Sequence, residues 1–265
     1  MTKKNVVEFR AMKQRGDKIA MLTAYDASCS ALLVRAGIDV ILVGDSLGNV
    51  VQGHSTTLPV TVEEMLYHTQ CVRRGAPDAF VIADLPFLAD STPVMVIENA
   101  GKLMKQGGAQ MVKLEGGANQ VRNVELLTAH QIPVCGHLGL LPQSVHKVGG
   151  YRVQGRDEVG AAQILADAKA LEEAGADMIV LECVPSLLAD QIRLSLAIPI
   201  IGIGAGVGCD GQVLVLYDML GLTSGKRPKF SHDFLVDSRG IQEAVETYVK
   251  AVKAGTFPAN EHSFS

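Results

Sequence analysis

Eight short apolar runs, rich in β-branched residues, are spaced along the 265-residue chain, and most are followed by a stretch of helical character. Their apolar character is nearly continuous rather than alternating, which is typical of parallel strands covered on both faces. The predicted strands are Ile19–Tyr25, Val40–Asp45, Phe80–Asp84, Met111–Glu115, Val134–His137, Met178–Glu182, Ile200–Gly204 and Gln212–Asp218. Eight such units favour a closed (β/α)8 barrel, the TIM-barrel class of α/β fold, over an open sheet. We expect residues 1–265 to form a single domain, with an N-terminal segment over 1–18 and a C-terminal tail over 256–265.

Helix start and stop signals lie between these runs. Thr61 followed by Glu64 is a capping-box pattern, and Thr92 precedes a proline at the first helical position of another segment. The predicted helices are Ala27–Ala36, Val62–Arg74, Pro93–Gln106, Gln120–Ala129, Glu158–Ala174, Ser186–Leu196 and Ser238–Ala254. Between the seventh and eighth strands only Gly206–Gly211 remains, which is too short for a crossover helix. Either the eighth strand is misassigned or this unit of the barrel is degenerate.

The charge balance excludes several classes of partner. The formal net charge is −4, from 24 basic and 28 acidic residues, so the chain carries no electrostatic footprint for nucleic acid or an anionic membrane. No run approaches the roughly 18 apolar residues of a membrane span, and Met1–Lys18 lacks the apolar core of a signal peptide. We therefore expect a cytoplasmic protein whose five cysteines are reduced and mostly buried. The residues over 257–265 are expected to be a loosely held surface extension.

Ionisable residues stand at the ends of the apolar runs. In a β/α barrel the carboxyl ends of the strands converge on one mouth, where the chemistry takes place. The residues in these positions are Asp45, Asp84, Lys113, Glu115, His137 and Glu182. Several carboxylates, with water and ligand oxygens, suit a hard cation such as Mg2+. A lysine pointing into a barrel needs an opposite charge, either a substrate carboxylate or a metal-binding carboxylate.

Each of these residues has a structural alternative. A single Asp or Glu after a strand is more often a helix cap or a turn residue than a ligand. His137 could equally make a structural hydrogen bond or contact a substrate. The recurrence of carboxylates at successive strand ends is harder to explain by caps alone, so the joint pattern favours a functional site.

A glycine-rich stretch over 202–211 contains the spacing G-x-G-x-x-G from Gly206 to Gly211. In a dinucleotide-binding fold this pattern opens a helix, whereas here it leads into a predicted strand. Tight turns that let substrate approach the backbone are the favoured interpretation, with a phosphate-binding turn of the barrel as an alternative.

Longer motifs carry a family resemblance. The segments that carry it are Val43–Asn49, Gly53–Thr61, Tyr67–Thr69, Arg73–Gly75, Ala83–Phe87, Val112–Gly117, Gly136–Leu140, Pro142–Ser144, Gly149–Gly155, Leu181–Pro185 and Gly202–Leu216. Together they resemble the ketopantoate hydroxymethyltransferase family over about residues 3 to 264. The chain departs from the family pattern at Asn49, at Leu88–Asp90 and at Cys183. None of these departures changes an ionisable position of the expected site, but Leu88–Asp90 could alter the rim of the pocket.

The resemblance implies a barrel of the phosphoenolpyruvate/pyruvate type, usually a homodecamer, with one Mg2+ per subunit. The implied reaction transfers a hydroxymethyl group from the cosubstrate 5,10-methylenetetrahydrofolate to 3-methyl-2-oxobutanoate through a Mg2+-stabilised enolate. It yields 2-dehydropantoate on the pantothenate route. The implied metal ligands are Asp45, Asp84 and Glu115, the last directly or through water. The expected substrate contacts are Asp45, Ser46, Asp84, Lys113 and His137, and Glu182 is the expected proton acceptor.

Two alternatives remain open at this point. A metal-dependent oxoacid lyase or aldolase of the same barrel type would use the same Asp–Asp–Glu set, but it would turn over without folate. A non-catalytic metal or oxoacid sensor would bind the oxoacid without forming product.

Overall fold

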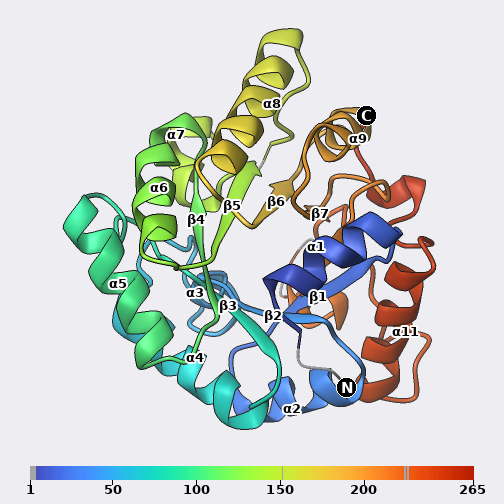
Figure 1. Cartoon of the computed structure of the whole chain (residues 1–265). Helices are drawn as coiled ribbons and strands as arrows, with labels where there is room; N and C mark the ends of the chain where they lie inside the picture. Colours follow the sequence, from blue (N-terminus) through green and yellow to red (C-terminus); the bar gives the residue numbers. More distant parts are fainter. Residues whose placement is uncertain (1–3, 151, 224, 226) are drawn as a thin grey trace.

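Eight parallel strands close into a barrel, as the sequence predicts. The computed structural model describes residues 4–150, 152–223, 225 and 227–265. The strands are β1 (Ile19–Thr23), β2 (Val40–Val43), β3 (Phe80–Asp84), β4 (Met111–Glu115), β5 (Val134–Gly139), β6 (Met178–Glu182), β7 (Ile200–Ile203) and β8 (Gly211–Leu214). The barrel closes where β1 pairs with β8, and helices surround it (Figure 1). The chain therefore has the TIM-type α/β barrel fold.

The helices are α1 (Val6–Arg15), α2 (Ala27–Arg35), α3 (Leu47–Val50), α4 (Val62–Gly75), α5 (Pro93–Lys105), α6 (Val121–Ala129), α7 (Val145–Val148), α8 (Glu158–Glu173), α9 (Ser186–Ser195), α10 (Leu216–Met219) and α11 (Ile241–Lys253), with short 3-10 turns at Ala118–Gln120, Pro142–Ser144 and Asn260–His262. All seven predicted helices are present, and their ends differ from the prediction by only a few residues. The capping box of α4 is confirmed, because Thr61 Oγ1 accepts from Glu64 N at 3.2 Å and Glu64 Oε2 accepts from Thr61 N at 2.7 Å.

The unit between β7 and β8 is degenerate, which resolves the alternative left open by the sequence. Strand β8 is shorter than predicted, since the chain turns at Val215 into the short helix α10. The connection over 204–210 has no helix and runs beside α9, where a Cβ at Gly208 would overlap the carboxyl group of Asp190 and one at Gly206 would press on Ser186. The glycines are thus required by close packing against α9. The dinucleotide-binding spacing is coincidental, because it opens no helix.

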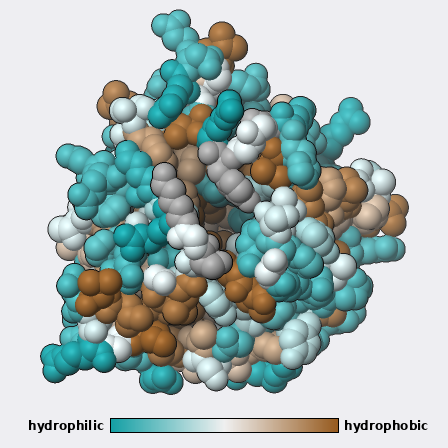
Figure 2. Space-filling model, turned by 180° about the vertical axis from the view of Figure 1, so that it is seen from behind, coloured by the Kyte–Doolittle hydropathy of each residue, from teal (hydrophilic) through white to brown (hydrophobic). Residues whose placement is uncertain are grey.

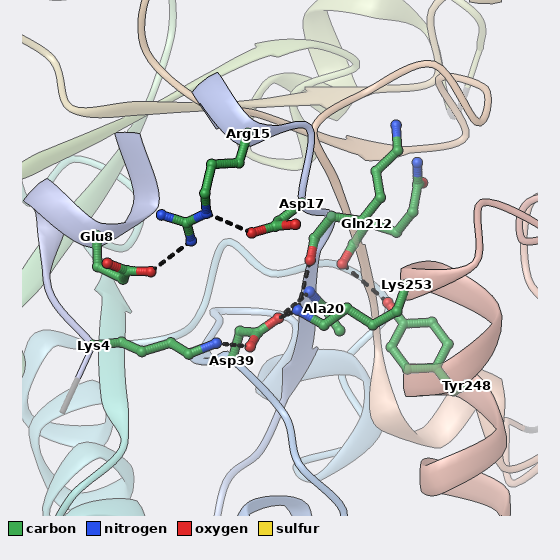
Figure 3. A network of polar contacts seen from close by, with 10 residues as sticks. Lys4, Glu8, Arg15, Asp17, Ala20, Asp39, Gln212, Tyr248 and Lys253 are labelled. Carbon is green, nitrogen blue, oxygen red and sulfur yellow. Dashed lines mark hydrogen bonds and ion pairs between the residues drawn. The ribbon is translucent and has the colours of Figure 1, made fainter. Parts of the chain in front are cut away.

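The amino end of the barrel is closed. Helix α1, which the sequence analysis did not predict, lies across this end (Figure 1), and Phe9 packs edge-to-face on Phe80 with ring centroids 5.0 Å apart. The buried Asp39 accepts a hydrogen bond from Ala20 N at 2.8 Å and pairs with both Lys4 and Lys253 (Figure 3). One carboxylate therefore ties the N-terminal segment, the barrel and α11 together.

The C-terminal tail is not the loosely held extension that we expected. Phe257 is buried and packs against Phe234 and Tyr248, with ring centroids 5.3 and 5.8 Å away. Further along, Phe264 O accepts a hydrogen bond from Ser186 N at 3.0 Å. Aromatic packing against Phe234 and α11, together with a backbone hydrogen bond from α9, thus holds the tail, although its sequence has no element signal.

Two further expectations concern membranes and cysteines. None of the helices over the described residues has the length and apolar character needed to span a membrane. All five cysteines are free thiols: three are buried, and Cys29 and Cys71 are partly buried.

Candidate active site

A cavity of about 640 Å3 opens at the carboxyl ends of the strands. From the side opposite to Figure 1, the surface is hollowed near its centre (Figure 2). The predicted residues that line the cavity are Asp45, Ser46, Asp84, Lys113, Glu115, His137 and Glu182. Residues up to 137 positions apart are therefore brought to one mouth.

Asp45 and Asp84 lie side by side at the ends of β2 and β3. Asp84 Oδ2 accepts a hydrogen bond from Asp45 N at 3.1 Å. Gly44 leaves room for the Ser46 hydroxyl, since a Cβ there would be 2.9 Å from Ser46 Oγ. Burial, together with the charges of Asp84 and Glu115, raises the pKa of Asp45 to about 8. Asp45 therefore keeps its proton to a higher pH than an ordinary carboxyl group does.

Lys113 supplies the cation beside this pair. It stands opposite Asp84 in the β3–β4 register, and its Nζ lies 2.9 Å from Asp84 Oδ1. Burial alone would lower the pKa of Lys113, but the carboxylates of Asp84, Glu115 and Asp45 outweigh it and raise that pKa. The lysine is therefore a fixed positive charge inside the cavity.

His137 lies between two carboxylates. Its Nδ1 is 3.3 Å from Glu115 Oε1, and its Nε2 is 3.2 Å from Glu182 Oε2. Burial and the charge of Lys113 oppose protonation of the ring, yet the two glutamates prevail and raise the pKa of His137 to about 9. Glu182 itself is the more accessible partner, with 13% of its side chain exposed against 4% for Glu115. An imidazolium in this position places a positive charge beside the Glu182 carboxylate, although Nε2 makes no well-aligned hydrogen bond with the described residues.

Gln143 was not among the site residues predicted from the sequence. It belongs to Pro142–Ser144, one of the segments that carry the family resemblance. Its Nε2 donates to Asp45 Oδ2 at 2.9 Å and to Leu85 O at 3.0 Å, and its backbone N–H donates to Glu115 Oε2 at 3.0 Å. One residue from the loop after β5 therefore fixes two of the site's carboxylates. A neutral amide outside the strand ends gives no charge pattern by which it could have been found.

Tyr25 is a second residue without a sequence signal. Its hydroxyl lies 2.9 Å from Ser46 Oγ, and its ring is buried at the end of β1. The contact orients the Ser46 hydroxyl at the cavity wall.

The three departures from the family pattern have distinct places. Asn49 and Cys183 line the cavity, and Cys183 adopts a φ of +49°, a strained value directly after Glu182. The Leu88–Asp90 segment lies beside the cavity instead. Asp90 Oδ2 accepts from Gln120 Nε2 at 2.7 Å, and Gln120 Nε2 also donates to Glu115 O at 3.0 Å. This segment therefore supports the backbone of Glu115.

The site residues fit a hard divalent cation in charge and donor type. Asp84 Oδ1 is buried, and none of the described residues gives it a well-aligned hydrogen bond. No group of three His, Cys, Asp or Glu side chains in the described part of the chain is arranged to hold a metal by itself. Mg2+ commonly keeps several waters and uses one or two carboxylates plus substrate oxygens, so the Asp45–Asp84 pair meets its requirement.

Comparison with known proteins identifies the family. The sequence pattern of ketopantoate hydroxymethyltransferase matches residues 3–260. The chain belongs to this family. It is 58% identical over 259 residues to the 3-methyl-2-oxobutanoate hydroxymethyltransferase of Halorhodospira halophila, covering 98% of this chain and 94% of that protein. The enzyme of the same name from Nitrosococcus oceani is 55% identical over 264 residues, with both chains fully covered.

More distant solved structures share the barrel. A phosphonomutase-like protein from Burkholderia cenocepacia superposes with a TM-score of 0.66 at 16% identity, covering 82% of this chain and 94% of that one. A 2,3-dimethylmalate lyase of the PEP mutase/isocitrate lyase superfamily gives 0.59 at 18% identity, covering 82% and 79%. At these identities the likeness concerns the fold alone. Membership of the ketopantoate hydroxymethyltransferase family makes the chain a hydroxymethyltransferase, which disfavours both the lyase and the sensor interpretations.

Proposed function

We propose that this enzyme transfers a hydroxymethyl group from 5,10-methylenetetrahydrofolate to 3-methyl-2-oxobutanoate and so forms 2-dehydropantoate for pantothenate biosynthesis. The observation that carries the proposal is the meeting of Asp45, Asp84, Lys113 and Glu182 in one cavity. Relatives that match the whole chain carry the name 3-methyl-2-oxobutanoate hydroxymethyltransferase, which names the oxoacid. The proposal includes a cytoplasmic location and a homodecameric assembly, which rest on the resemblance.

The oxoacid would be held by its own oxygens. Lys113 offers a buried ammonium to the substrate carboxylate, and the Ser46 hydroxyl, oriented by Tyr25, offers a hydrogen bond. The protonated ring of His137 adds a second positive charge beside Lys113. A small α-oxoacid presents a matching row of acceptors along its carboxylate and keto group. These contacts would fix the carbon chain relative to Glu182.

Asp45 and Asp84 are the residues that would hold one Mg2+, with Glu115 in its shell directly or through water. When bound, the ion would act as a Lewis acid toward the keto oxygen of the oxoacid. Gln143 would keep Asp45 and Glu115 in place while the substrate enters. Lys113 would meanwhile limit the repulsion between the carboxylates.

Glu182 would remove the proton from carbon 3 of the oxoacid. Its Oε2 lies 3.2 Å from His137 Nε2, so a protonated imidazole balances the charge of the carboxylate before the proton arrives. The proton would then reside on Glu182 while carbon 3 forms its bond to the one-carbon unit. Both carbon–nitrogen bonds of that unit to the folate would break, water would supply the hydroxyl oxygen, and the proton from carbon 3 and one from water would go to the two nitrogens of the released tetrahydrofolate. A general base in this arrangement contributes about 10²–10⁴ in rate.

The proposal is tested by the dependence of turnover on folate. Purified enzyme with Mg2+, 3-methyl-2-oxobutanoate and 5,10-methylenetetrahydrofolate should form 2-dehydropantoate, detected by mass spectrometry. Omission of the folate should stop all consumption of the oxoacid, because the one-carbon unit has no other source. Consumption that continues without folate would contradict the proposal and would favour an oxoacid lyase.

A further inference from the structure

The cavity is larger than the oxoacid site needs. Pockets of about 300–1,000 Å3 bury ligands of drug size, whereas the oxoacid has five carbon atoms, and the cavity measures about 640 Å3. The carboxylates discussed above come from β2 to β6. The remaining wall is built from the end of β8, the start of α10, the segment after it and the C-terminal tail. Most of its described side chains are apolar: Val213, Leu214, Val215, Pro228, Phe230 and Phe264.

One buried acid stands in this apolar wall. Asp218, on α10, lines the cavity and is 6% exposed. Among the described residues, its side chain accepts a hydrogen bond from the hydroxyl of Thr223. Burial raises the pKa of Asp218, while the hydrogen bond from Thr223 and the positive charge of Arg227 oppose the rise. Glu182 lines the same cavity, and its negative charge adds to the rise. None of the steps proposed for the oxoacid uses Asp218.

A carboxylate at an apolar wall is suited to a particular ligand chemistry. Burying an acid costs free energy unless donors satisfy it, and two parallel N–H donors on one planar ring satisfy a carboxylate especially well. The aminopyrimidine edge of a pterin carries such a pair, formed by its 2-amino group and the adjacent ring N–H. The rings of Phe230 and Phe264 give the wall the aromatic surface that a flat heterocycle packs against.

We propose that Asp218 anchors the pterin end of the folate cosubstrate, its carboxylate accepting from the 2-amino group and the ring N–H. This inference rests on the proposed function, since it names the subsite of the cosubstrate in that reaction. The one-carbon unit is attached to the pterin on the side away from the aminopyrimidine edge. Asp218 and Glu182 line the same cavity, so an anchor at Asp218 would let one cavity hold the folate and the oxoacid together.

The test is to measure ligand binding in the variant Asp218→Asn. The amide keeps the size of the side chain and an acceptor for Thr223, but it replaces one carboxylate oxygen with a donor that opposes the pterin N–H groups. Calorimetric affinity for tetrahydrofolate should fall about 10- to 100-fold, as expected for a lost pair of charge-assisted hydrogen bonds. Affinity for 6-methyltetrahydropterin, which lacks the aminobenzoyl-glutamate tail, should fall by the same factor. Affinity for 3-methyl-2-oxobutanoate with Mg2+ should keep its wild-type value.

Two controls separate the possible failures. Thr223→Val removes the hydroxyl contact and keeps the carboxylate, so it should affect pterin binding less than Asp218→Asn does; equal losses would make Asp218 a structural residue and overturn the inference. Wild-type affinity of a folded Asp218→Asn variant for tetrahydrofolate would also overturn it. If the wild-type enzyme itself binds no tetrahydrofolate, the proposed function fails as well, and this outcome is seen before any variant is made.

Discussion

At the scale of single residues, the site depends on the way in which charge is balanced around Glu182. His137 is held between Glu115 and Glu182, and Lys113 lies beside it, 3.4 Å from His137 Nδ1 and 2.9 Å from Asp84 Oδ1. Glu182 is the member of this group that is both accessible and fixed from one side. These properties suit a base that must take a proton from a substrate and then return it.

The variant Glu182→Gln tests this role. Exchange of the carbon-3 proton of 3-methyl-2-oxobutanoate for solvent deuterium, followed by NMR with Mg2+ present, should slow by about 10²–10⁴ because the amide cannot accept the proton. Oxoacid binding should persist, since the proposed metal ligands are unchanged. Glu173→Gln, at an exposed position of α8, is the matched control and should exchange like the wild type. Fast exchange in Glu182→Gln would assign the base to another group.

Gln143 provides a second test at this scale. Gln143→Ala removes the donor to Asp45 Oδ2 and leaves the backbone donor to Glu115 in place. Loss of a residue that orients metal ligands typically weakens metal affinity about 10- to 100-fold. Calorimetric titration with Mg2+ should show this loss, while Gln163→Ala on the outer helix α8 should not. Unchanged Mg2+ affinity in Gln143→Ala would mean that Asp45 needs no support.

The sequence indicates some site residues and not others for a physical reason. Asp45 and Asp84 could be predicted because a charge that directly follows an apolar strand is conspicuous, and barrel geometry says where it must point. Gln143 could not, since it lies beyond a strand end and acts through contacts made by loop geometry. Asp218 ended the predicted eighth strand but was given no role, and the structure places it on α10. The buried environment of His137 likewise arises only when β4, β5 and β6 are brought together.

At the scale of elements, continuous apolar runs and helix caps were sufficient to locate the barrel. Helix α1 was missed because its residues are mixed in charge, and its place depends on contacts such as Phe9 on Phe80. The tail was misjudged for the same reason, since Phe257 is buried by residues far away in the sequence. Strand β8 was predicted too long because an apolar run does not reveal where a strand becomes a helix.

Helix α11 contributes one contact that can be tested by itself. The buried Tyr248 hydroxyl lies 2.9 Å from Met21 O and 3.0 Å from Gln212 O, on the two strands that close the barrel. Figure 3 shows the contact with Gln212. Tyr248→Phe should lower the free energy of unfolding by about 1 kcal/mol, which corresponds to about 2–4 °C in Tm for a chain of this size. Tyr67→Phe, at an exposed position of α4, should leave Tm unchanged. Equal Tm values for the two variants would show that the contact of this hydroxyl with β1 and β8 does not stabilise the fold.

At the scale of the whole molecule, the crowded carboxylates make stability depend on pH. The folded protein has a pKa of about 8 at Asp45 and about 9 at His137, against ordinary values of 3.8 and 6.5. Both are raised on folding, so the folded state binds more protons than the unfolded chain, and the free energy of unfolding falls as the pH rises through these ranges.

Thermal unfolding of the metal-free protein should therefore show Tm decreasing between pH 6.5 and 9. Saturating Mg2+ should raise Tm more at pH 9 than at pH 6, since proton and cation compete for the same carboxylates. Asp45→Asn should flatten the metal-free profile. A metal-free Tm that increases over this range would contradict the charge balance described for the cavity.

The central claim is that strand-end carboxylates at one barrel mouth hold a cation and an oxoacid within reach of Glu182. A crystal structure of the enzyme soaked with Mg2+ and 3-methyl-2-oxobutanoate tests it most directly. We predict the ion on Asp45 and Asp84, the substrate carboxylate near Lys113, and a Glu182 oxygen facing carbon 3. An oxoacid bound elsewhere, or a carbon 3 turned away from Glu182, would contradict the account.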